Sequence, residues 1–367
     1  MKSSRERRSS RIVSCAPVSQ LLAYLSNPRP TVRRNAVMAL VDLPSRSPVM
    51  PIIRLLGDID PRVRRAAATT LGQMKARRAV NPILPLLQDK HLTVRVAAAT
   101  ALGSIGDPRV IRPLIETFSD RWRAMNGSIE ALAVIGTPSI PHLLEALSHS
   151  DFRVRQCAIR ALGEMRAHCA LSELVCALKD RFHAVQRAAQ HALVKLGRRH
   201  VGQLGRMLNS PSLRIGRGVV EVLKGLKATE ELVQAARNGE SFTRVFAIEA
   251  LVEWGDPRAV EPLLACLRSE HSRIRARAAL RLRAYQDSRA VPALAKLLKD
   301  PDSWVRWCAT GTLQELRDVR AVGAIEDALL NEQDRSVRFH LAYTLEILLG
   351  GDAIISHWDT LDSHRAN

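Results

Sequence analysis

The stretch Ala79–Ile105, AVNPILPLLQDKHLTVRVAAATALGSI, contains two apolar runs separated by a short polar break. Apolar residues recur at spacings of three and four from Val80 to Leu87, and again from Val94 to Ile105. This period places the apolar side chains of each run on one face of a helix. We call the two predicted helices A and B. The residues that follow, Gly106-Asp107-Pro108, predict the end of helix B because glycine and proline are typical of helix C-termini.

The same two-helix unit recurs along almost the whole chain of 367 residues. Its clearest marker is a leucine in helix B, which recurs at intervals of 28 to 32 residues. A period of this size is typical of stacked repeats, in which each unit buries its apolar face against the next. The leucines are Leu40, Leu71, Leu102, Leu132, Leu162, Leu193, Leu223, Leu251, Leu282, Leu313 and Leu345.

The segment Asp60–Gly72, DPRVRRAAATTLG, resembles the D-x-x-V-R-x-A-A-x-A-L-G pattern of HEAT repeats of the short, phycobilin-lyase-like type. The resemblance implies an all-α fold, a right-handed α-α superhelix of about eleven two-helix repeats, whose B helices line a concave surface. We expect the solenoid to cover residues 17–350, with a basic disordered tail at 1–16 and a C-terminal tail or cap at 351–367. Such repeats occur in scaffolds, chaperones, lyases and hydroxylases, so the fold does not define the function.

One arginine recurs immediately after position 0, which we define as the residue eight positions before each leucine. The resemblance implies that this arginine is structural and meets an aspartate between the helices of a repeat. Asp60, Asp151, Asp302 and Asp334 stand at position −3, where they can also cap helix B. Met125, Gln186 and Gly216 replace the arginine, so we expect repeats four to seven, with Gly127, Gly216 and Gly218 in their B helices, to be the most flexible segment. The arginines are Arg33, Arg64, Arg95, Arg155, Arg244, Arg275, Arg306 and Arg338.

Positions +2, +6 and +9 lie opposite the apolar stripe of helix B and are predicted to face solvent. Two groups in these rows are candidate binding residues. The first is basic and consists of Arg34, Arg65, Arg187 and Arg217 at +2 and Arg160 at +6. The second is apolar, near the C-terminus, and consists of Trp307 and Phe339 at +2 and Leu280 and Tyr343 at +6. The alternative for the second group is that Ile354, Ile355 and Trp358 fold back over it as a cap.

A further set of arginines falls in the predicted first turn of helix B, where a cation opposes the helix dipole. These arginines either hold an anion together with free N–H groups or pair with nearby acids. The set is Arg62, Arg123, Arg153, Arg214 and Arg273.

Catalytic and metal-binding signatures are missing from the sequence. Deoxyhypusine hydroxylase has a similar fold and binds iron through His-Glu pairs, but this chain has no His-Glu dipeptide. His191 with Glu221 or Glu249 is the one constellation of possible ligands in the +6 row. A P-loop, a G-x-S-x-G motif and an H-E-x-x-H motif are also absent. We therefore predict a protein that is not an enzyme and that needs no metal or cofactor.

Charge indicates the kind of partner. Lys and Arg exceed Asp and Glu by 19, and the first 100 residues carry 18 basic against 5 acidic side chains. The last 67 residues are acidic, with 6 basic and 11 acidic side chains. We predict a cytoplasmic, monomeric binding scaffold that docks an acidic protein or peptide, without membrane insertion because no apolar run approaches 18 residues. The alternatives are a nucleic-acid-binding HEAT-repeat protein and a phycobilin-lyase-like subunit or chaperone.

Overall fold

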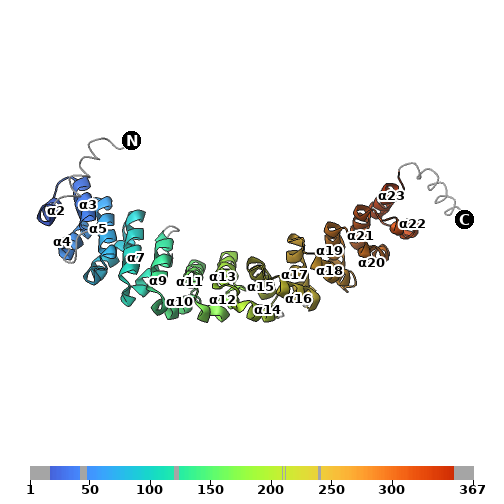
Figure 1. The fold of residues 1–367 in the computed structure, drawn as a ribbon, viewed down its shortest axis with the longest axis horizontal. Helices are drawn as coiled ribbons and strands as arrows, with labels where there is room; N and C mark the ends of the chain where they lie inside the picture. Colours follow the sequence, from blue (N-terminus) through green and yellow to red (C-terminus); the bar gives the residue numbers. More distant parts are fainter. Residues whose placement is uncertain are drawn as a thin grey trace. The chain divides into compact units, whose positions relative to one another are not determined.

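The computed structural model describes residues 17–41, 48–119, 124–208, 210, 212–238 and 241–350. These residues form helices and no strand. They fall into two compact units, Met1–Gly197 and Arg198–Asn367, and repeats one to six belong to the first unit and repeats seven to eleven to the second. Within each unit, Figure 1 shows successive repeats stacked in chain order. The predicted all-α solenoid of eleven two-helix repeats is therefore confirmed, and the two predicted tails lie outside the described residues.

The A helices are short, and most begin or end with a 3₁₀ turn. In the first unit they are α2 (Val18–Tyr24), α4 (Val49–Arg54) with η1 (Leu55–Gly57), η2 (Arg77–Ala79) with α6 (Val80–Ile83) and η3 (Leu84–Gln88), η4 (Pro108–Val110) with α8 (Ile111–Glu116) and η5 (Thr117–Ser119), η6 (Thr137–Ser139) with α10 (Ile140–Ala146), and η7 (His168–Ala170) with α12 (Leu171–Ala177). In the second unit they are η8 (Arg198–His200) with α14 (Val201–Met207), α16 (Thr229–Asn238), η9 (Pro257–Ala259) with α18 (Val260–Cys266), η11 (Ser288–Ala290) with α20 (Val291–Leu297), and η12 (Val319–Ala321) with α22 (Val322–Asn331).

The B helices are longer and continuous. In the first unit they are α3 (Pro30–Ala39), α5 (Pro61–Gln73), α7 (Leu92–Ile105), α9 (Ala124–Ile135), α11 (Phe152–Glu164) and α13 (His183–Leu196). In the second unit they are α15 (Leu213–Gly225), α17 (Ser241–Glu253), α19 (Ser272–Leu282) with η10 (Arg283–Tyr285), α21 (Ser303–Leu316) and α23 (Arg335–Leu349).

Local sequence explains where the helices begin and end. Helix α7 ends at Gly106, whose φ of 73° is left-handed and costs glycine little. Asp107 then begins η4 by accepting a hydrogen bond from the backbone N–H of Arg109. The glycine and proline punctuation predicted from the sequence is therefore present in the structure.

The core of each unit lies between its A and B helices. The eleven marker leucines are at most 5% exposed, which confirms that they form one buried row. Alanines at positions +4 and +7 of many B helices are also buried, and these small side chains let successive B helices pack closely.

Candidate binding surfaces

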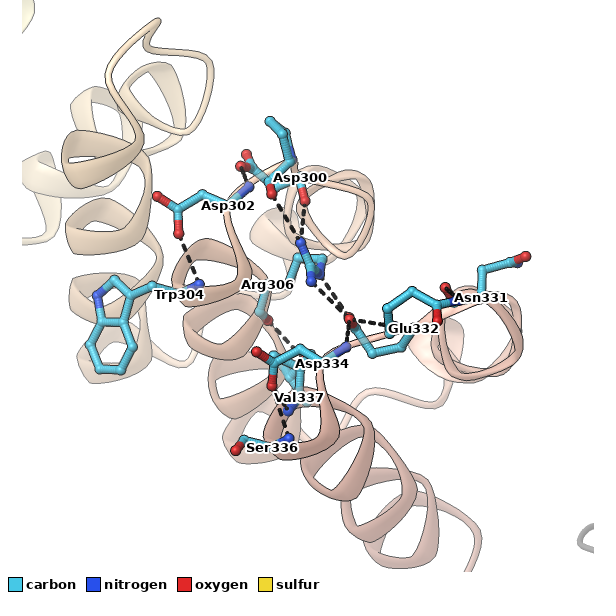
Figure 2. A network of polar contacts seen from close by, with 12 residues as sticks. Asp300, Asp302, Trp304, Arg306, Asn331, Glu332, Asp334, Ser336 and Val337 are labelled. Atoms are coloured by element: carbon cyan, nitrogen blue, oxygen red, sulfur yellow. Dashed lines mark hydrogen bonds and ion pairs between the residues drawn. The ribbon is translucent and has the colours of Figure 1, made fainter.

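Arg306 joins two inter-helix turns of the second unit (Figure 2). Its Nε donates to Glu332 Oε2 at 2.7 Å and its Nη2 donates to Glu332 Oε1 at 2.8 Å. Its Nη1 donates to the carbonyl oxygen of Asp300 at 2.8 Å. Asp300 belongs to the turn of the same repeat and Glu332 to the turn of the next repeat, so one side chain fastens neighbouring repeats. We call this arrangement the repeat tie.

The repeat tie recurs in both units, with Nε to carboxylate distances of 2.7 to 2.8 Å. In four of the tied acids, Asp58, Asp89, Asp180 and Glu332, burial raises the carboxyl pKa, but the arginine hydrogen bond, a backbone N–H and nearby positive charge together bring that pKa below its usual value. The carboxylates are therefore charged at neutral pH. The pairs are Arg33–Asp58, Arg64–Asp89, Arg155–Asp180, Arg275–Asp300 and Arg306–Glu332.

The structure corrects the predicted partner of the repeat arginine. Asp60, Asp151, Asp302 and Asp334 do cap the B helices, accepting hydrogen bonds from backbone N–H groups in the first turn. The tied acids stand two residues earlier, at position −5, because only the start of the turn lies within reach of the preceding repeat's arginine. An acid recurring five residues before position 0 was the sequence signal that the prediction missed.

Three of the eight predicted tie arginines show no ion pair among the described residues. Arg95 donates to the carbonyl of Asp89 at 2.8 Å, and the acid expected 25 residues on, Asp120, lies outside the described residues. Arg244 faces a repeat whose position −5 is Ser269. The position 25 residues after Arg338 is Ser363, which lies outside the described residues.

Repeats four to seven, which we expected to be the most flexible segment, do contain one repeat tie. Arg155, one of the eight predicted structural arginines, forms the Arg155–Asp180 tie and so joins repeats five and six within this stretch. Gln186 replaces the arginine, yet its Nε2 still donates to the Asp180 carbonyl at 2.6 Å. Gly216, named as a source of flexibility, is buried against Thr243 Oγ1 and the Leu208 carbonyl, so it serves close packing.

At Gly72, Gly103 and Gly163, position +9 is a contact surface, and the prediction that it faces solvent is wrong there, although Arg283 and Glu346 in the same row are exposed. A methyl group added to Gly72 lies 2.6 Å from Ala101 Cα, and one added to Gly103 lies 2.5 Å from Ala131 Cα. Both alanines stand at position +7 of the next repeat. The prediction failed because a solenoid helix has a neighbour on each side, which widens the buried arc beyond its apolar stripe.

Position +2 is also less exposed than predicted, because it borders position +3 of the following repeat. Val96 Cγ1 lies 3.4 Å from where a Cβ of Gly127 would be, and Trp307 packs on His340 with ring centroids 5.0 Å apart. Ala276 in the same row is buried. Of the rows predicted to face solvent, position +6 is the one whose side chains are most consistently exposed.

The five arginines of the basic group lie on B helices and have only weak partners. Arg65, Arg160, Arg187 and Arg217 are exposed, and Arg34 is half-buried. Arg34 and Arg160 each donate to an asparagine Oδ1 at 3.0 Å, and the Arg217 guanidinium lies 5.7 Å from the Phe246 ring centroid. None of the five forms an ion pair with another described residue. Their charge therefore remains available on the surface of α3, α5, α11, α13 and α15.

Exposed aromatic side chains gather on α21 and α23. Trp307, Phe339 and Tyr343 line a shallow cavity of about 510 Å³ together with Arg335 and His340. Phe339 is 74% exposed and Tyr343 is 48% exposed. Trp304, which sequence reasoning missed, stacks on Trp307 with ring centroids 5.0 Å apart and is 55% exposed. We call Trp304, Trp307, Phe339 and Tyr343 the aromatic cluster.

Leu280 is exposed at position +6 of α19 but is not among the residues that line the cavity. His340, beneath the cluster, pairs with Gln314 Oε1 at 3.0 Å. Burial lowers the pKa of the His340 ring, and the charge of Arg283 lowers it further, so the ring is neutral at pH 7.

Two of the arginines in the first turn of helix B pair with the aspartate that caps the helix. Arg153 Nη2 lies 2.8 Å from Asp151 Oδ2, and Arg62 Nε lies 3.6 Å from Asp60 Oδ1. Arg214 and Arg273 are exposed, and Arg123 lies outside the described residues. The same Asp-x-Arg pairing begins several A helices, which the prediction missed, at Asp107–Arg109, Asp256–Arg258, Asp287–Arg289 and Asp318–Arg320.

These repeats match a known family. The family model described as HEAT repeats matches residues 18–83, 60–133, 127–194, 229–295 and 269–346, which together cover most of the chain. The chain belongs to the HEAT-repeat family. This confirms the resemblance drawn from Asp60–Gly72. A comparison with individually curated proteins found no match.

Several solved structures are similar to this HEAT-repeat chain. An engineered protein is 20% identical over 91% of this chain and 99% of its own, with a TM-score of 0.35. The karyopherin Kap121p bound to the extreme C-terminus of the protein phosphatase Cdc14p is 15% identical over 98% of this chain and 49% of its own, with a TM-score of 0.46. The complex of CpcE and CpcF of phycocyanin lyase from Nostoc sp. PCC7120 is 22% identical over 68% of this chain and 92% of its own, with a TM-score of 0.34. The chain thus spans about half the length of the karyopherin.

The described HEAT repeats contain no group of three or more His, Cys, Asp or Glu side chains that could hold a metal ion. Glu249, considered with His191 from the sequence, pairs with Arg277 in the second unit. Within the part of the chain that the structure describes, no helix has the length and apolarity to span a membrane.

Proposed function

We propose that this HEAT-repeat protein is a non-catalytic scaffold that docks an acidic protein or peptide on the surface of its B helices. The observation that carries the proposal is the aromatic cluster. The chain is only 4% aromatic, yet three of its fourteen aromatic side chains, Trp307, Phe339 and Tyr343, line one cavity, and a fourth, Trp304, stacks on Trp307. Exposed apolar groups that gather in this way are typical of interaction sites in proteins.

The cavity favours a peptide with an apolar anchor beside an acidic residue. Phe339 and Tyr343 offer apolar area that a leucine or aromatic side chain of a partner would cover. Arg335 is exposed on the wall of the same cavity and offers a guanidinium to a partner carboxylate. Aromatic and arginine side chains are the residue types that contribute most to binding energy at protein interfaces.

The arginines of the basic group favour an acidic partner as well, and they lie on both units. Arg65 and Arg187 on the first unit and Arg217 on the second are exposed without an ion pair among the described residues. Exposed charges of this kind raise the association rate with an acidic partner more than they raise affinity. We therefore assign the aromatic cluster to anchoring and the basic group to attraction.

The experiment is a selection of displayed twelve-residue peptides on the full-length protein, followed by affinity measurements with the selected peptides. We expect the peptides to combine an aromatic or leucine side chain with acidic neighbours. Phe339→Ala should weaken their binding about tenfold or more, as loss of an interface anchor does, while its thermal unfolding stays unchanged. Val319→Ala is the matched control, because Val319 is 66% exposed and lies outside the cavity.

Selected peptides that bind Phe339→Ala as well as the wild type would refute an anchoring role for the cluster. A loss of stability in Phe339→Ala or Tyr343→Ala would also oppose it, because it would indicate that the cluster is covered by the rest of the chain.

Nucleic-acid binding is the second candidate, and the unpaired arginines of the basic group favour it. A duplex-binding protein should lose affinity for arbitrary duplex steeply between 50 and 200 mM salt, by about 10³-fold or more for six phosphate contacts. Duplex binding that falls in Arg65→Ala and Arg187→Ala but not in Phe339→Ala would replace the peptide scaffold by this function.

A further inference from the structure

The junction between repeats eight and nine has the arginine of a repeat tie but not the acid. Arg244 stands at position +1 of α17, and Ser269 stands 25 residues later in the turn between α18 and α19. The neighbouring tie in the same unit, Arg275–Asp300, has the same spacing. Both residues of the incomplete junction belong to the second unit.

Ser269 makes the same two hydrogen bonds within its turn as the tied acid Asp300 makes in the next repeat. Its Oγ accepts a hydrogen bond from the backbone N–H two residues on, at 3.3 Å, as Asp300 Oδ1 does at 3.0 Å. Its carbonyl oxygen accepts a hydrogen bond from Arg275, as the Asp300 carbonyl accepts one from Arg306. The turn is therefore built like the others, and only the negative group is different.

Arg244 is left with an unsatisfied donor. Its Nε is buried and has no hydrogen-bond partner among the described residues, whereas Nε of each tied arginine donates to a carboxylate. The side chain extends toward repeat nine, because its guanidinium hydrogen-bonds the Cys266 thiol at the end of α18, a weak acceptor that leaves Nε without a partner. A buried donor without a partner is destabilising, so this junction favours an added acceptor.

We propose that Ser269 is a phosphorylation site and that the phosphoryl group completes the missing repeat tie with Arg244. A protein kinase would supply the group from a nucleoside triphosphate. A bond forms between Ser269 Oγ and the γ-phosphorus, the bond from that phosphorus to the β–γ bridging oxygen breaks, and the hydroxyl proton is released. The products are phosphoserine and a nucleoside diphosphate.

Phosphoserine suits this position in length and charge. Its oxygens lie farther from the backbone than those of aspartate, and Glu332 shows that a longer acid at position −5 still reaches its arginine, at 2.7 Å. The added charge of about −1.5 to −2 faces Arg244 and lies in a turn with the exposed Arg268 and Arg273 nearby in sequence. Exposed Glu270 is the one adjacent acid, and it can extend into solvent.

Access for a kinase is provided by the turn itself. Ser269 is half-buried, and its neighbours Arg268, Glu270 and His271 are exposed. The modification would stiffen the contact between α17 and α19 without involving the aromatic cluster, so this inference does not depend on the proposed scaffold function.

The experiment compares full-length protein carrying serine or phosphoserine at position 269, in the wild-type and Arg244→Gln backgrounds. Native-state hydrogen exchange reports the opening of α17 and α19. Phosphoserine should raise protection there about tenfold, which corresponds to about 1.4 kcal/mol. The gain should vanish in Arg244→Gln. Ser269→Asp, which restores the acid of the other junctions, should give a similar gain and avoids the need for a modified residue.

Ser210→Asp is the matched control, because Ser210 also stands at position −5 and its Oγ also accepts a backbone N–H, but the preceding repeat carries Gln186. It should give no gain. Inorganic phosphate added to the unmodified protein should have no effect. Protection by free phosphate that depends on Arg244 would overturn the covalent assignment. A gain that persists in Arg244→Gln, or no gain from either phosphoserine or aspartate, would overturn the proposal altogether.

Discussion

The two units use position +9 of their B helices differently. In three of the six repeats of the first unit it is a glycine, Gly72, Gly103 or Gly163, that packs directly against an alanine of the next B helix, and in the other three it is Val41, Ala133 and Val194. In the second unit the same position is Lys224, Val252, Arg283, Gln314 and Glu346. Helices that carry such side chains cannot approach as closely, and Lys224 and Arg283 instead form ion pairs with Glu253 and Glu315. Close glycine–alanine packing at position +9 is therefore found at three junctions of the first unit, while the second unit carries no glycine at this position.

The repeat tie is common to both units, so breaking it should have the largest effect in either. Arg64→Ala in the first unit and Arg306→Ala in the second leave Asp89 and Glu332 charged and buried. Removing one partner of a buried ion pair costs about 3–5 kcal/mol. Native-state hydrogen exchange should show this loss in the two repeats on each side of the broken tie.

Arg320→Ala is the control for these variants, because the Arg320–Asp318 pair is exposed and should contribute little. Equal losses of hydrogen-exchange protection in Arg306→Ala and Arg320→Ala would show that burial does not determine how much an ion pair stabilises the protein.

The close packing at position +9 of the first unit can be tested against Gly323, a glycine of the second unit that lies in the A helix α22 and in open space. Gly103→Ala places a methyl group 2.5 Å from Ala131 Cα, so the backbones of α7 and α9 must move apart, at a cost of about 1–3 kcal/mol. Gly323→Ala in the second unit meets nothing within 4 Å. It should stabilise α22 by up to about 1 kcal/mol because alanine favours helix over glycine. Urea denaturation of both variants tests the contrast, and a Gly103→Ala variant as stable as the wild type would refute the close-packing account.

The sequence predicted those parts of the fold that follow from one helix taken alone. The leucine row, the cap aspartates and the glycine at the end of α7 were confirmed because each depends on residues within a turn or two of the chain. Contacts between repeats were harder to predict. The acid of the tie and the burial of Gly72 depend on the neighbouring repeat, which a helical wheel does not include.

Among the candidate binding residues, too, those that depend on a single helix were predicted, and one that depends on a contact with another side chain was missed. Phe339 and Tyr343 are exposed as predicted, since their rows face away from the apolar stripe of α23. Trp304 was missed because at position −1 the sequence analysis considered only the arginines, and Trp304 reaches the cluster by stacking on Trp307. Whether these residues bind a partner stays a prediction.

The ion pairs that replace close packing in the second unit should be worth less than the glycine contacts. Arg283 and Glu315 are both largely exposed, so the pair is screened by solvent. Arg283→Ala should therefore change the free energy of unfolding by less than about 1 kcal/mol, and the change should shrink at high salt. A loss as large as that of Gly103→Ala would mean that the two ways of joining B helices are equivalent.

The smallest expected effect concerns pH and only the second unit. The folded-state pKa of His340 lies below the ordinary value of 6.5, first because of burial and then because of Arg283. The unfolded chain therefore takes up a proton more readily than the folded chain, and the contribution of neutral His340 is present above pH 6.5 and lost as the pH falls through that value. Hydrogen exchange of α21 and α23 between pH 7.5 and 5.5, corrected for the intrinsic rate, should show this loss in the wild type and less of it in His340→Gln. Protection of α5 and α7 should not depend on that substitution, because His340 acts only through the aromatic cluster and Gln314 on which it packs.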